Sequence, residues 1–363
     1  IYWEVSEAEK AGHDHFMYKE ILEQPEVIER TISGRIETTS EEIPIKLDEA
    51  SKYEKIWIVA CGTAYHAGLF GKDLFEKVLG VPVSVELASE FRYREPIVGK
   101  NDLGIVISQS GETMDTIAAT ELLKENGAHV LALVNVVGSS LARMADSIFY
   151  LHVGPEIGVA STKAYLGMLV GQLLLAKHWD STNKLDVSFD EIAELPKLIE
   201  QTMGCEKQIK DISEKIYKKN DIYFIGRGLD YALAAEGALK LKEISYLHAE
   251  ALAAGELKHG TLALIENGTP IIVTASQNHL LDKTTSNVQE VIARGAYVIA
   301  IGDNQSEKLE NISDEYVTLP DSNEILTTVL SIIPLQFIAY HVANLNGESI
   351  DQPRNLAKSV TVE

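Results

Sequence analysis

The chain has 363 residues, of which 45% are apolar and 24% are charged, and it carries a formal net charge of −22. This length allows about two domains of ordinary size, and the composition is typical of a globular protein. The strong acidity argues against nucleic acid and against an anionic membrane as partners, because both are bound through basic surfaces. An anionic small substrate remains possible if its pocket is locally basic.

The two cysteines, Cys61 and Cys205, are far apart and form neither a disulfide framework nor a metal motif. We therefore expect a reducing cytoplasm, no metal and no cofactor. No signal peptide is evident, and the longest apolar run, "LGMLVGQLLLA", is too short to span a membrane and is predicted to be a buried helix. The chain begins with Ile1 rather than Met, so we interpret it as a piece of a longer protein.

In chain order, a helical lead-in is predicted for residues 1–45. After it, short β-branched runs pass through Gly or Ser directly into helical patterns, as in "KIWIVACGTAYHAGLFGKDLFEKVLG" and "GIVISQSGETMDTIAATELLKENG". The second half has the same style in "DIYFIGRGLDYALAAEGALKLKEIS", "TPIIVTASQ" and "GAYVIAIGD". Alternation of strand, turn and helix predicts an α/β fold with parallel sheets.

The two halves also resemble each other. "NGAHVLALVN" (126–135) aligns with "RGAYVIAIGD" (294–303) at an offset of 168 residues, and an acidic residue follows eleven positions later in both halves, Asp146 and Asp314. We infer two tandem doubly wound domains, each with three α/β/α layers, over residues 46–185 and 186–347. Residues 348–363 form a C-terminal tail.

The segment "ISQSGET" is a candidate phosphate site. A strand ends there, a helix begins, and Gly111 stands among three hydroxyls and an amide, those of Ser108, Ser110, Thr113 and Gln109. Hydroxyls, a close backbone approach and free N–H groups at a helix start suit a phosphate. The alternative is an ordinary helix cap formed by Ser110. A second small-residue turn, "GVASTKAY", offers Ser161 and Thr162 to the same pocket.

Two further segments carry titratable groups. Glu236, Lys240 and Glu243 stand at i, i+4 and i+7 of "LAAEGALKLKEISY" and share one helical face. This face is either an exposed salt-bridged surface or a carboxylate base held beside a cation in a cleft. His259 lies between two glycines in "AGELKHG" and is either an acid–base group or an unremarkable loop histidine.

The chain ends in "DQPRNLAKSVTVE". Termini are usually poorly ordered, so a disordered tail is one interpretation. The other is that the tail folds back over a site and brings Lys358 to it.

The motifs "CGTAYHAG", "SQSGET", "ASTKAY", "EGALKLKEISYLHAEALAAGELKHG" and "DQPRNLAKSVTVE" occur here in this order. Together they resemble the isomerase half of glutamine–fructose-6-phosphate aminotransferases (glucosamine-6-phosphate synthases), which is built of two sugar isomerase (SIS) domains. The resemblance spans nearly the whole chain. Enzymes of this family also carry an N-terminal glutaminase domain, which has no counterpart in this sequence.

The resemblance implies fructose 6-phosphate as substrate and no cofactor. Its phosphate would bind to the cradle of Ser108, Gln109, Ser110 and Thr113, with Thr63 and Ser161 adjacent, and its sugar to the backbone of Val159 and Ala357. His259, from the neighbouring subunit of a homodimer, would open the ring. Lys358 would form a Schiff base at C2, ammonia from the glutaminase would replace it, and Glu243 would move a proton between C1 and C2.

Lys240 would then stand beside the developing charge, and Glu236 would orient Lys240 and His259. The product would be glucosamine 6-phosphate, and the isolated piece would only interconvert fructose 6-phosphate and glucose 6-phosphate. Where the family usually has Ser after "CGT", this chain has Ala64. Two alternatives stay open: a non-catalytic phosphosugar-binding module, and an aminosugar-phosphate deaminase or plain isomerase of the same fold.

Overall fold

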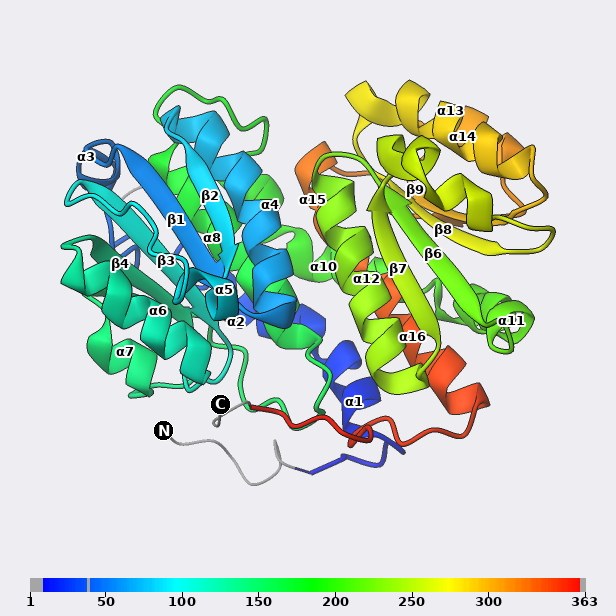
Figure 1. Cartoon of the computed structure of the whole chain (residues 1–363), viewed down its shortest axis with the longest axis horizontal. Coiled ribbons are helices and arrows are strands. Elements are labelled where there is room, and N and C mark those ends of the chain that lie inside the picture. The colour runs from blue at the N-terminus through cyan, green and yellow to red at the C-terminus, as the bar shows by residue number, and fades with distance from the viewer. Residues whose placement is uncertain (1–8, 38–39, 360–363) are drawn as a thin grey trace.

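The structure is a computed structural model that describes residues 9–37 and 40–359. The remaining parts of the predicted lead-in and tail, residues 1–8, 38–39 and 360–363, lie outside the described residues. The chain forms two lobes, and each lobe contains one five-stranded parallel sheet (Figure 1). The predicted α/β class with two tandem doubly wound sheets is therefore confirmed.

The first sheet has the strand order β2-β1-β3-β4-β5. Its strands are β1 (Lys55–Ala60), β2 (Val83–Leu87), β3 (Asp102–Ser108), β4 (His129–Val134) and β5 (Ser147–Tyr150). The central strand β3 is buried along its whole length, as expected for a parallel strand covered by helices on both faces. The order reverses between β1 and β3, and ligands of such sheets bind outside the carboxyl ends of the strands at this point.

The second sheet has the strand order β10-β9-β8-β6-β7 and so repeats the topology of the first. Its strands are β6 (Asp221–Gly226), β7 (His248–Ala253), β8 (Pro270–Ala275), β9 (Tyr297–Gly302) and β10 (Glu315–Thr318). The repeat extends to detail, because the backbone N–H of Val130 donates to the Asp146 carboxylate at 2.9 Å, as Val298 does to Asp314 at 2.7 Å. The offset of 168 residues predicted from the sequence thus joins equivalent positions.

Helices cover both faces of each sheet. In the first lobe they are α4 (Gly62–Leu79), α5 (Ala88–Phe91), α6 (Met114–Glu125), α7 (Ser140–Met144) and α8 (Lys163–Trp179). In the second lobe they are α12 (Leu229–Ser245), α13 (Leu281–Ile292), α14 (Glu307–Ile312), α15 (Glu324–Leu330) and α16 (Ile332–Leu345). Three short 3₁₀ helices are η2 (Ala254–His259), η3 (Thr261–Leu264) and η4 (Asn278–Leu280). Helices α4 and α12 pack against each other and join the lobes.

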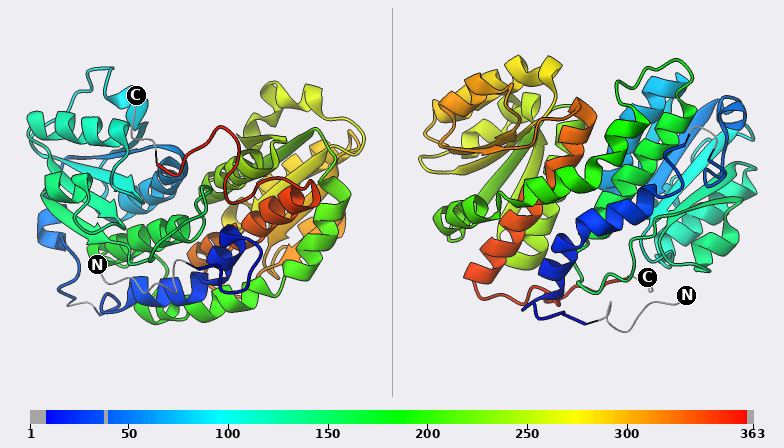
Figure 2. Two further views of the ribbon diagram at one scale, coloured as in Figure 1. Left: turned by 90° about the horizontal axis from the view of Figure 1, so that it is seen from below. Right: turned by 180° about the vertical axis from the view of Figure 1, so that it is seen from behind.

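The remaining helices belong to the lead-in and to the connection between the lobes. The lead-in contains α1 (Phe16–Leu22), α2 (Gln24–Ile32) and α3 (Leu47–Ala50). The connection contains α9 (Phe189–Ala193), α10 (Leu195–Met203) and α11 (Glu206–Ile216). Figure 2 shows the lead-in packed along the lobes and the tail running from the end of α16 back toward the first lobe.

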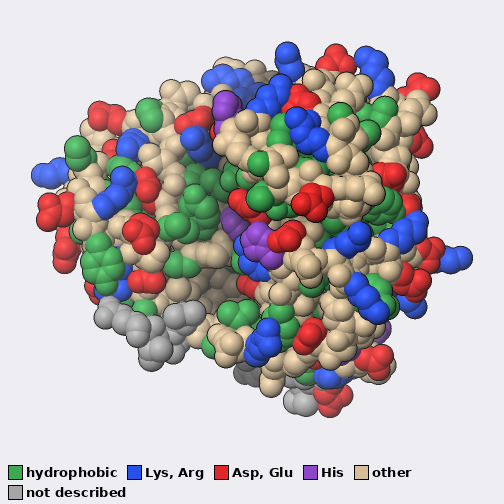
Figure 3. Space-filling model, turned by 45° about the vertical axis from the view of Figure 1, so that its right-hand side comes forward, with side chains coloured by type: hydrophobic (Ala, Val, Ile, Leu, Met, Phe, Trp, Pro, Cys, Tyr) green, Lys and Arg blue, Asp and Glu red, His purple; other side chains and the backbone are tan. Residues whose placement is uncertain are grey.

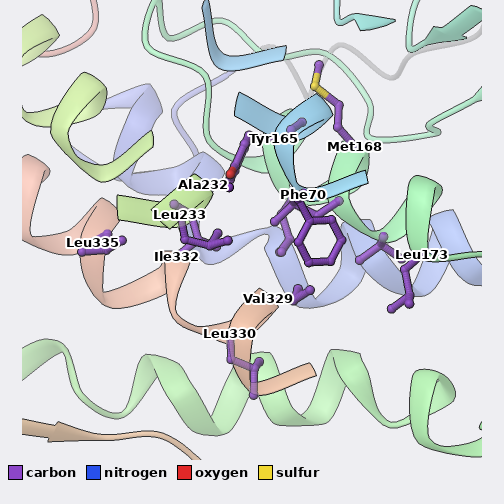
Figure 4. Close-up of a cluster of buried hydrophobic side chains, with 14 of the residues drawn as sticks. Phe70, Tyr165, Met168, Leu173, Ala232, Leu233, Val329, Leu330, Ile332 and Leu335 are labelled. Carbon is purple, nitrogen blue, oxygen red and sulfur yellow. The ribbon is translucent and has the colours of Figure 1, made fainter. Parts of the chain in front are cut away.

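One hydrophobic core is shared by both lobes. Figure 4 shows side chains of α4, α8, α12, α15 and α16 meeting in it, among them Phe70, Met168, Leu233 and Leu335. The predicted buried helix "LGMLVGQLLLA" lies in α8, which is buried along nearly its whole length. Among the described residues, Glu324–Leu345 is long and apolar enough to cross a membrane by length and composition, although its most apolar 18-residue stretch is entirely buried inside the fold. Polar residues, among them Ser331, Gln336 and His341, divide this run into shorter apolar stretches in the sequence.

The second lobe repeats part of "ISQSGET" at the end of β8. Ser276 and Gln277 occupy the positions equivalent to Ser108 and Gln109. Here a carboxylate from α12 fills the turn, because Asp230 accepts hydrogen bonds from the backbone N–H of Ser276 at 3.0 Å and from its hydroxyl at 2.7 Å. Asp230 and Ser276 are both fully buried, each with 1% exposure.

Candidate active site

A cavity of about 260 Å³ lies at the carboxyl ends of β1 and β3, where the order of the first sheet reverses. Its lining comes from the start of α4, the end of β3 with the turn and the start of α6 that follow it, the loop at 156–161, α8, α12 and the tail. Eleven predicted site residues are among its lining: Thr63, Ser108, Gln109, Ser110, Thr113, Val159, Ser161, Lys240, Glu243, Ala357 and Lys358. In Figure 3 the surface is hollowed between the two lobes, with hydrophobic side chains along one side of the hollow and charged and histidine side chains along the other.

The turn after β3 is stabilised by hydrogen bonds between its own polar groups. The backbone N–H of Gly111 donates to the Ser108 hydroxyl at 3.0 Å, and that hydroxyl lies 3.4 Å from the hydroxyl of Thr113. Gly111 has φ +66°, and a Cβ at this position would stand 2.1 Å from the Ser139 hydroxyl, so only glycine fits here. Helix α6 begins at Met114 with Thr113 as its N-cap, and within the described chain no side chain caps it. The turn therefore faces the cavity instead of serving as the ordinary cap that was the alternative.

The acidic and basic face of α12 is buried, so it is not an exposed salt-bridged surface. Lys240 is 1% exposed and Glu236 0%. The Lys240 ammonium lies 2.6 Å from the Glu243 carboxylate, 3.4 Å from that of Glu236, and donates to the Thr63 hydroxyl at 3.0 Å. Burial alone would lower the pKa of Lys240, but the charges of Glu236 and Glu243 raise it above its ordinary value. A partly exposed carboxylate thus stands at the cavity beside a permanently charged ammonium.

Glu236 lies behind the cavity wall and connects three groups. Besides its contact with Lys240, it accepts a hydrogen bond from Thr63 at 2.9 Å, and its second oxygen lies 2.8 Å from Nδ1 of His66. The sequence analysis did not assign a role to His66. His259 ends η2 in the second lobe and is exposed, and the described part of one chain does not bring it to the cavity. Within this chain Glu236 therefore contacts Lys240, Thr63 and His66.

The tail crosses the cavity and brings Lys358 to it. The Lys358 ammonium donates to a carboxylate oxygen of Glu156 at 2.6 Å and to the backbone carbonyl of Gly158 at 2.7 Å. The same carboxylate accepts from the Ser161 hydroxyl at 2.9 Å and from the backbone N–H of Thr162 at 2.9 Å. Although burial opposes ionisation, Lys358 and these donors lower the pKa of Glu156 below its usual range.

Glu156 was missed by the sequence analysis. It stands in "HVGPEIGVAST", where an isolated carboxylate between glycines and apolar residues is an available signal, because such a group needs a partner when it is buried. Its partner, Lys358, lies about two hundred residues away in the chain. Only the folded chain shows that the two meet.

The lead-in also reaches this loop. Glu20 of α1 is 2% exposed, and its Oε1 accepts hydrogen bonds from the backbone N–H groups of Ile157 and Gly158. Farther along, the Asp351 carboxylate accepts from the backbone N–H groups at the start of α1, and the Asp351 carbonyl accepts from Val159 at 3.1 Å. Burial and the nearby charge of Glu156 raise the pKa of Glu20 to about 7.

A raised pKa in a buried carboxyl group predicts a pH-dependent stability. The folded chain holds the Glu20 proton up to pH about 7, whereas an ordinary carboxyl group loses it near 4.5. The protein therefore becomes less stable as the pH rises through this interval. Above pH 7 the ionised Glu20 lowers the free energy of unfolding by about 3 kcal/mol. We expect Glu20→Gln to match wild type near pH 4.5 and to be more stable above pH 7, as measured by urea unfolding. Equal stability of the two proteins at pH 8 would contradict this.

The chain is similar in sequence to several known proteins. The family described as SIS domain matches residues 50–177 and 215–345. The glutamine–fructose-6-phosphate aminotransferase [isomerizing] of Caldanaerobacter subterraneus subsp. tengcongensis is 50% identical over 373 aligned positions, and that of Pyrococcus horikoshii is 48% identical over 366. The alignments cover 100% of this chain but only 61% and 60% of those two proteins.

Solved structures have the same architecture. The C-terminal domain of glucosamine-fructose-6-phosphate aminotransferase from Francisella tularensis superimposes with a TM-score of 0.88 at 40% identity, over 95% of this chain and 100% of that one. A glucosamine-6-phosphate deaminase from Thermotoga maritima superimposes with a TM-score of 0.74 at 23% identity, over 95% and 99% of the two chains. The second likeness supports the fold alone.

Proposed function

The chain belongs to the SIS domain family, and from this premise we propose that it is the sugar-isomerising part of a glutamine–fructose-6-phosphate aminotransferase. The observation that carries the proposal is the meeting of three groups in one cavity. These are the hydroxyl-lined turn after β3, the Glu243–Lys240 pair on α12, and the amine of Lys358 on the tail. A ketose phosphate needs all three, namely an anion site, a base beside a cation, and an amine that attacks a carbonyl.

The turn after β3 binds the phosphate of fructose 6-phosphate in this proposal. Three hydroxyls, the Gln109 amide and the Thr63 hydroxyl face the same space. Neutral donors of this kind, with the N-terminus of α6 behind them, suit a phosphate even in a protein of net charge −22. Because Ala64 lines the cavity where a hydroxyl is usual in the family, one donor is missing, which costs about 1 kcal/mol of phosphate binding.

The proposed reaction takes place at the carbonyl end of the sugar. His259 of a neighbouring subunit in a homodimer opens the ring. The Lys358 amine adds to the C2 carbonyl and water leaves, which gives an imine. Ammonia, supplied by a glutaminase domain, displaces the lysine and leaves the nitrogen on C2. Glu243 takes a proton from C1 and returns it to C2, while the Lys240 ammonium stabilises the negative charge that develops between them. The product is glucosamine 6-phosphate.

Without ammonia the same groups interconvert fructose 6-phosphate and glucose 6-phosphate. A non-catalytic binding module has no need for a buried cation beside a carboxylate at its cavity. A deaminase or a plain isomerase remains the closer alternative, and the Lys358 amine in the cavity favours the aminotransferase. We also propose that the protein acts in the cytoplasm and has neither nucleic acid nor a membrane as a partner.

A borohydride trap tests the role of Lys358. The protein is incubated with fructose 6-phosphate, reduced and digested, and the modified peptide is identified by mass spectrometry. We expect a sugar-phosphate adduct on Lys358. The Lys358→Met variant should form no adduct and should keep its isomerase kcat within about tenfold of wild type, because Glu243 carries out the proton transfer. Isomerisation without any adduct on Lys358 would favour a plain isomerase.

A further inference from the structure

The lead-in contains a buried carboxyl group that the proposed reaction does not use. Glu20 of α1 binds the backbone of the loop at 157–158 through Oε1 alone. Its Oε2 is buried and has no hydrogen-bond partner among the described residues. Unpaired buried oxygens are costly and uncommon, so one that lies against the loop at 157–158 points to a role for the group that carries it.

The loop above Glu20 is the one that holds Lys358. Gly158 donates its N–H to Glu20 on one side and accepts from the Lys358 ammonium, through its carbonyl, on the other. Glu156 and Val159, the neighbours of this two-residue segment, line the cavity. A Cβ on Gly158 would stand 3.0 Å from Oε2 of Glu20, so the carboxyl group lies directly against this loop.

We propose that Glu20 is a positioning residue for Lys358, which fixes from the lead-in helix the loop that presents Glu156 and the Gly158 carbonyl to the lysine. The proposal rests on the proposed function only for the meaning of Lys358 as the imine-forming amine. The contact itself makes the lead-in a part of the site. Without this anchor, the two N–H groups of the loop lose their acceptor and the lysine loses its fixed orientation.

The charges around Glu20 come from three other parts of the chain. Glu156 faces it from the loop and Lys358 from the tail, while Lys163 of α8 lies near it and is paired with Glu23 at 2.7 Å. An ionised carboxylate accepts N–H hydrogen bonds more strongly than a neutral carboxyl group, but burial and the charge of Glu156 penalise ionisation of Glu20 and raise its pKa to about 7. Ionisation of Glu20 therefore favours opening of this contact, and the loop is held less firmly above neutral pH than below it.

Two carbonyl compounds distinguish a correctly oriented Lys358 from one that is merely exposed to solvent. Formaldehyde with cyanoborohydride methylates any accessible amine and needs no sugar site. Fructose 6-phosphate with cyanoborohydride labels only a lysine that is correctly placed beside bound sugar. For Glu20→Ala we expect labelling of the Lys358 peptide to become about tenfold faster with formaldehyde and about tenfold slower with fructose 6-phosphate. Both rates come from mass spectrometry of the digested protein.

The Glu20→Gln variant tests whether ionisation of Glu20 matters. A purely structural hydrogen-bond acceptor would give the same labelling rates as glutamine at every pH. Glutamine keeps an oxygen for the two N–H groups but cannot ionise, so at every pH it should behave as wild type does at low pH. We expect the wild-type formaldehyde rate to show a step near pH 7 that is missing in Glu20→Gln. Glu26→Gln is the matched control, because Glu26 is an exposed carboxylate of the same lead-in and should change neither rate.

The outcomes separate the two proposals. Unchanged formaldehyde labelling of Lys358 in both Glu20 variants would overturn the positioning role, whatever the sugar does. If wild type gives no sugar adduct at any pH, the proposed function of Lys358 fails, but the formaldehyde rates still decide whether Glu20 holds the lysine in place.

Discussion

Replacing Glu243 with Gln is expected to lower kcat for the conversion of fructose 6-phosphate to glucose 6-phosphate by about a thousandfold. Glutamine has nearly the same shape and can still accept from the Lys240 ammonium, but it cannot take a proton from C1. The KM should change little, because the phosphate donors lie on the first lobe and are untouched. The measurement is a coupled assay of glucose 6-phosphate at saturating substrate.

The matched control for this experiment is Glu214→Gln. Glu214 is an exposed carboxylate on α11, in the connection between the lobes, and its loss should leave kcat unchanged. A Glu243→Gln protein that keeps kcat within tenfold of wild type would show that another group moves the proton. His66 would then be the first residue to replace, because it connects to the same ion pairs through Glu236.

Replacing Lys240 with Met is expected to lower the free energy of unfolding by about 4 kcal/mol. Lys240 is the cation beside Glu236, which is 0% exposed, and without it this carboxylate is a buried charge whose nearest ammonium has gone. Glu243 is partly exposed and can turn to water, so the cost falls mainly on Glu236. Guanidinium unfolding at pH 7 measures the loss.

Lys242→Met is the control, because Lys242 is an exposed lysine on the same helix, and its replacement should cost less than about 0.5 kcal/mol. Adding Glu236→Leu to Lys240→Met should restore part of the lost stability, since no lone charge is then left buried. Equal stability of the Lys240 and Lys242 variants would contradict a stabilising role of Lys240 beside Glu236.

The sequence predicted the structure well where a residue pattern has a single physical explanation. The β-branched runs predicted the parallel strands, because a strand covered on both faces must be apolar throughout. The internal offset of 168 predicted two equal sheets, and Asp146 and Asp314 do occupy equivalent positions. The turn after β3 could be located because hydroxyls and a glycine between a strand and a helix are the donors that an anion needs.

The sequence was less informative where the partner is distant. Periodicity could not separate a buried charged face on α12 from an exposed one, because both give the same i, i+4 spacing. The burial comes from α4 of the other lobe, which no local pattern reveals. Glu156 and Glu20 were missed for the same reason, since the role of each depends on the loop, tail and lead-in meeting in space.

The buried Asp230–Ser276 contact bears on how many substrates one chain can hold. The second lobe has the same topology as the first and an equivalent turn, so duplication of an ancestral domain would be expected to yield two anion sites. The Asp230 carboxyl group already accepts the N–H and O–H donors of this turn, so they are not available to a phosphate. Helix α12, which carries Asp230, instead lines the cavity of the first lobe with Lys240 and Glu243. We therefore expect one sugar phosphate per chain, although the two sheets have the same topology.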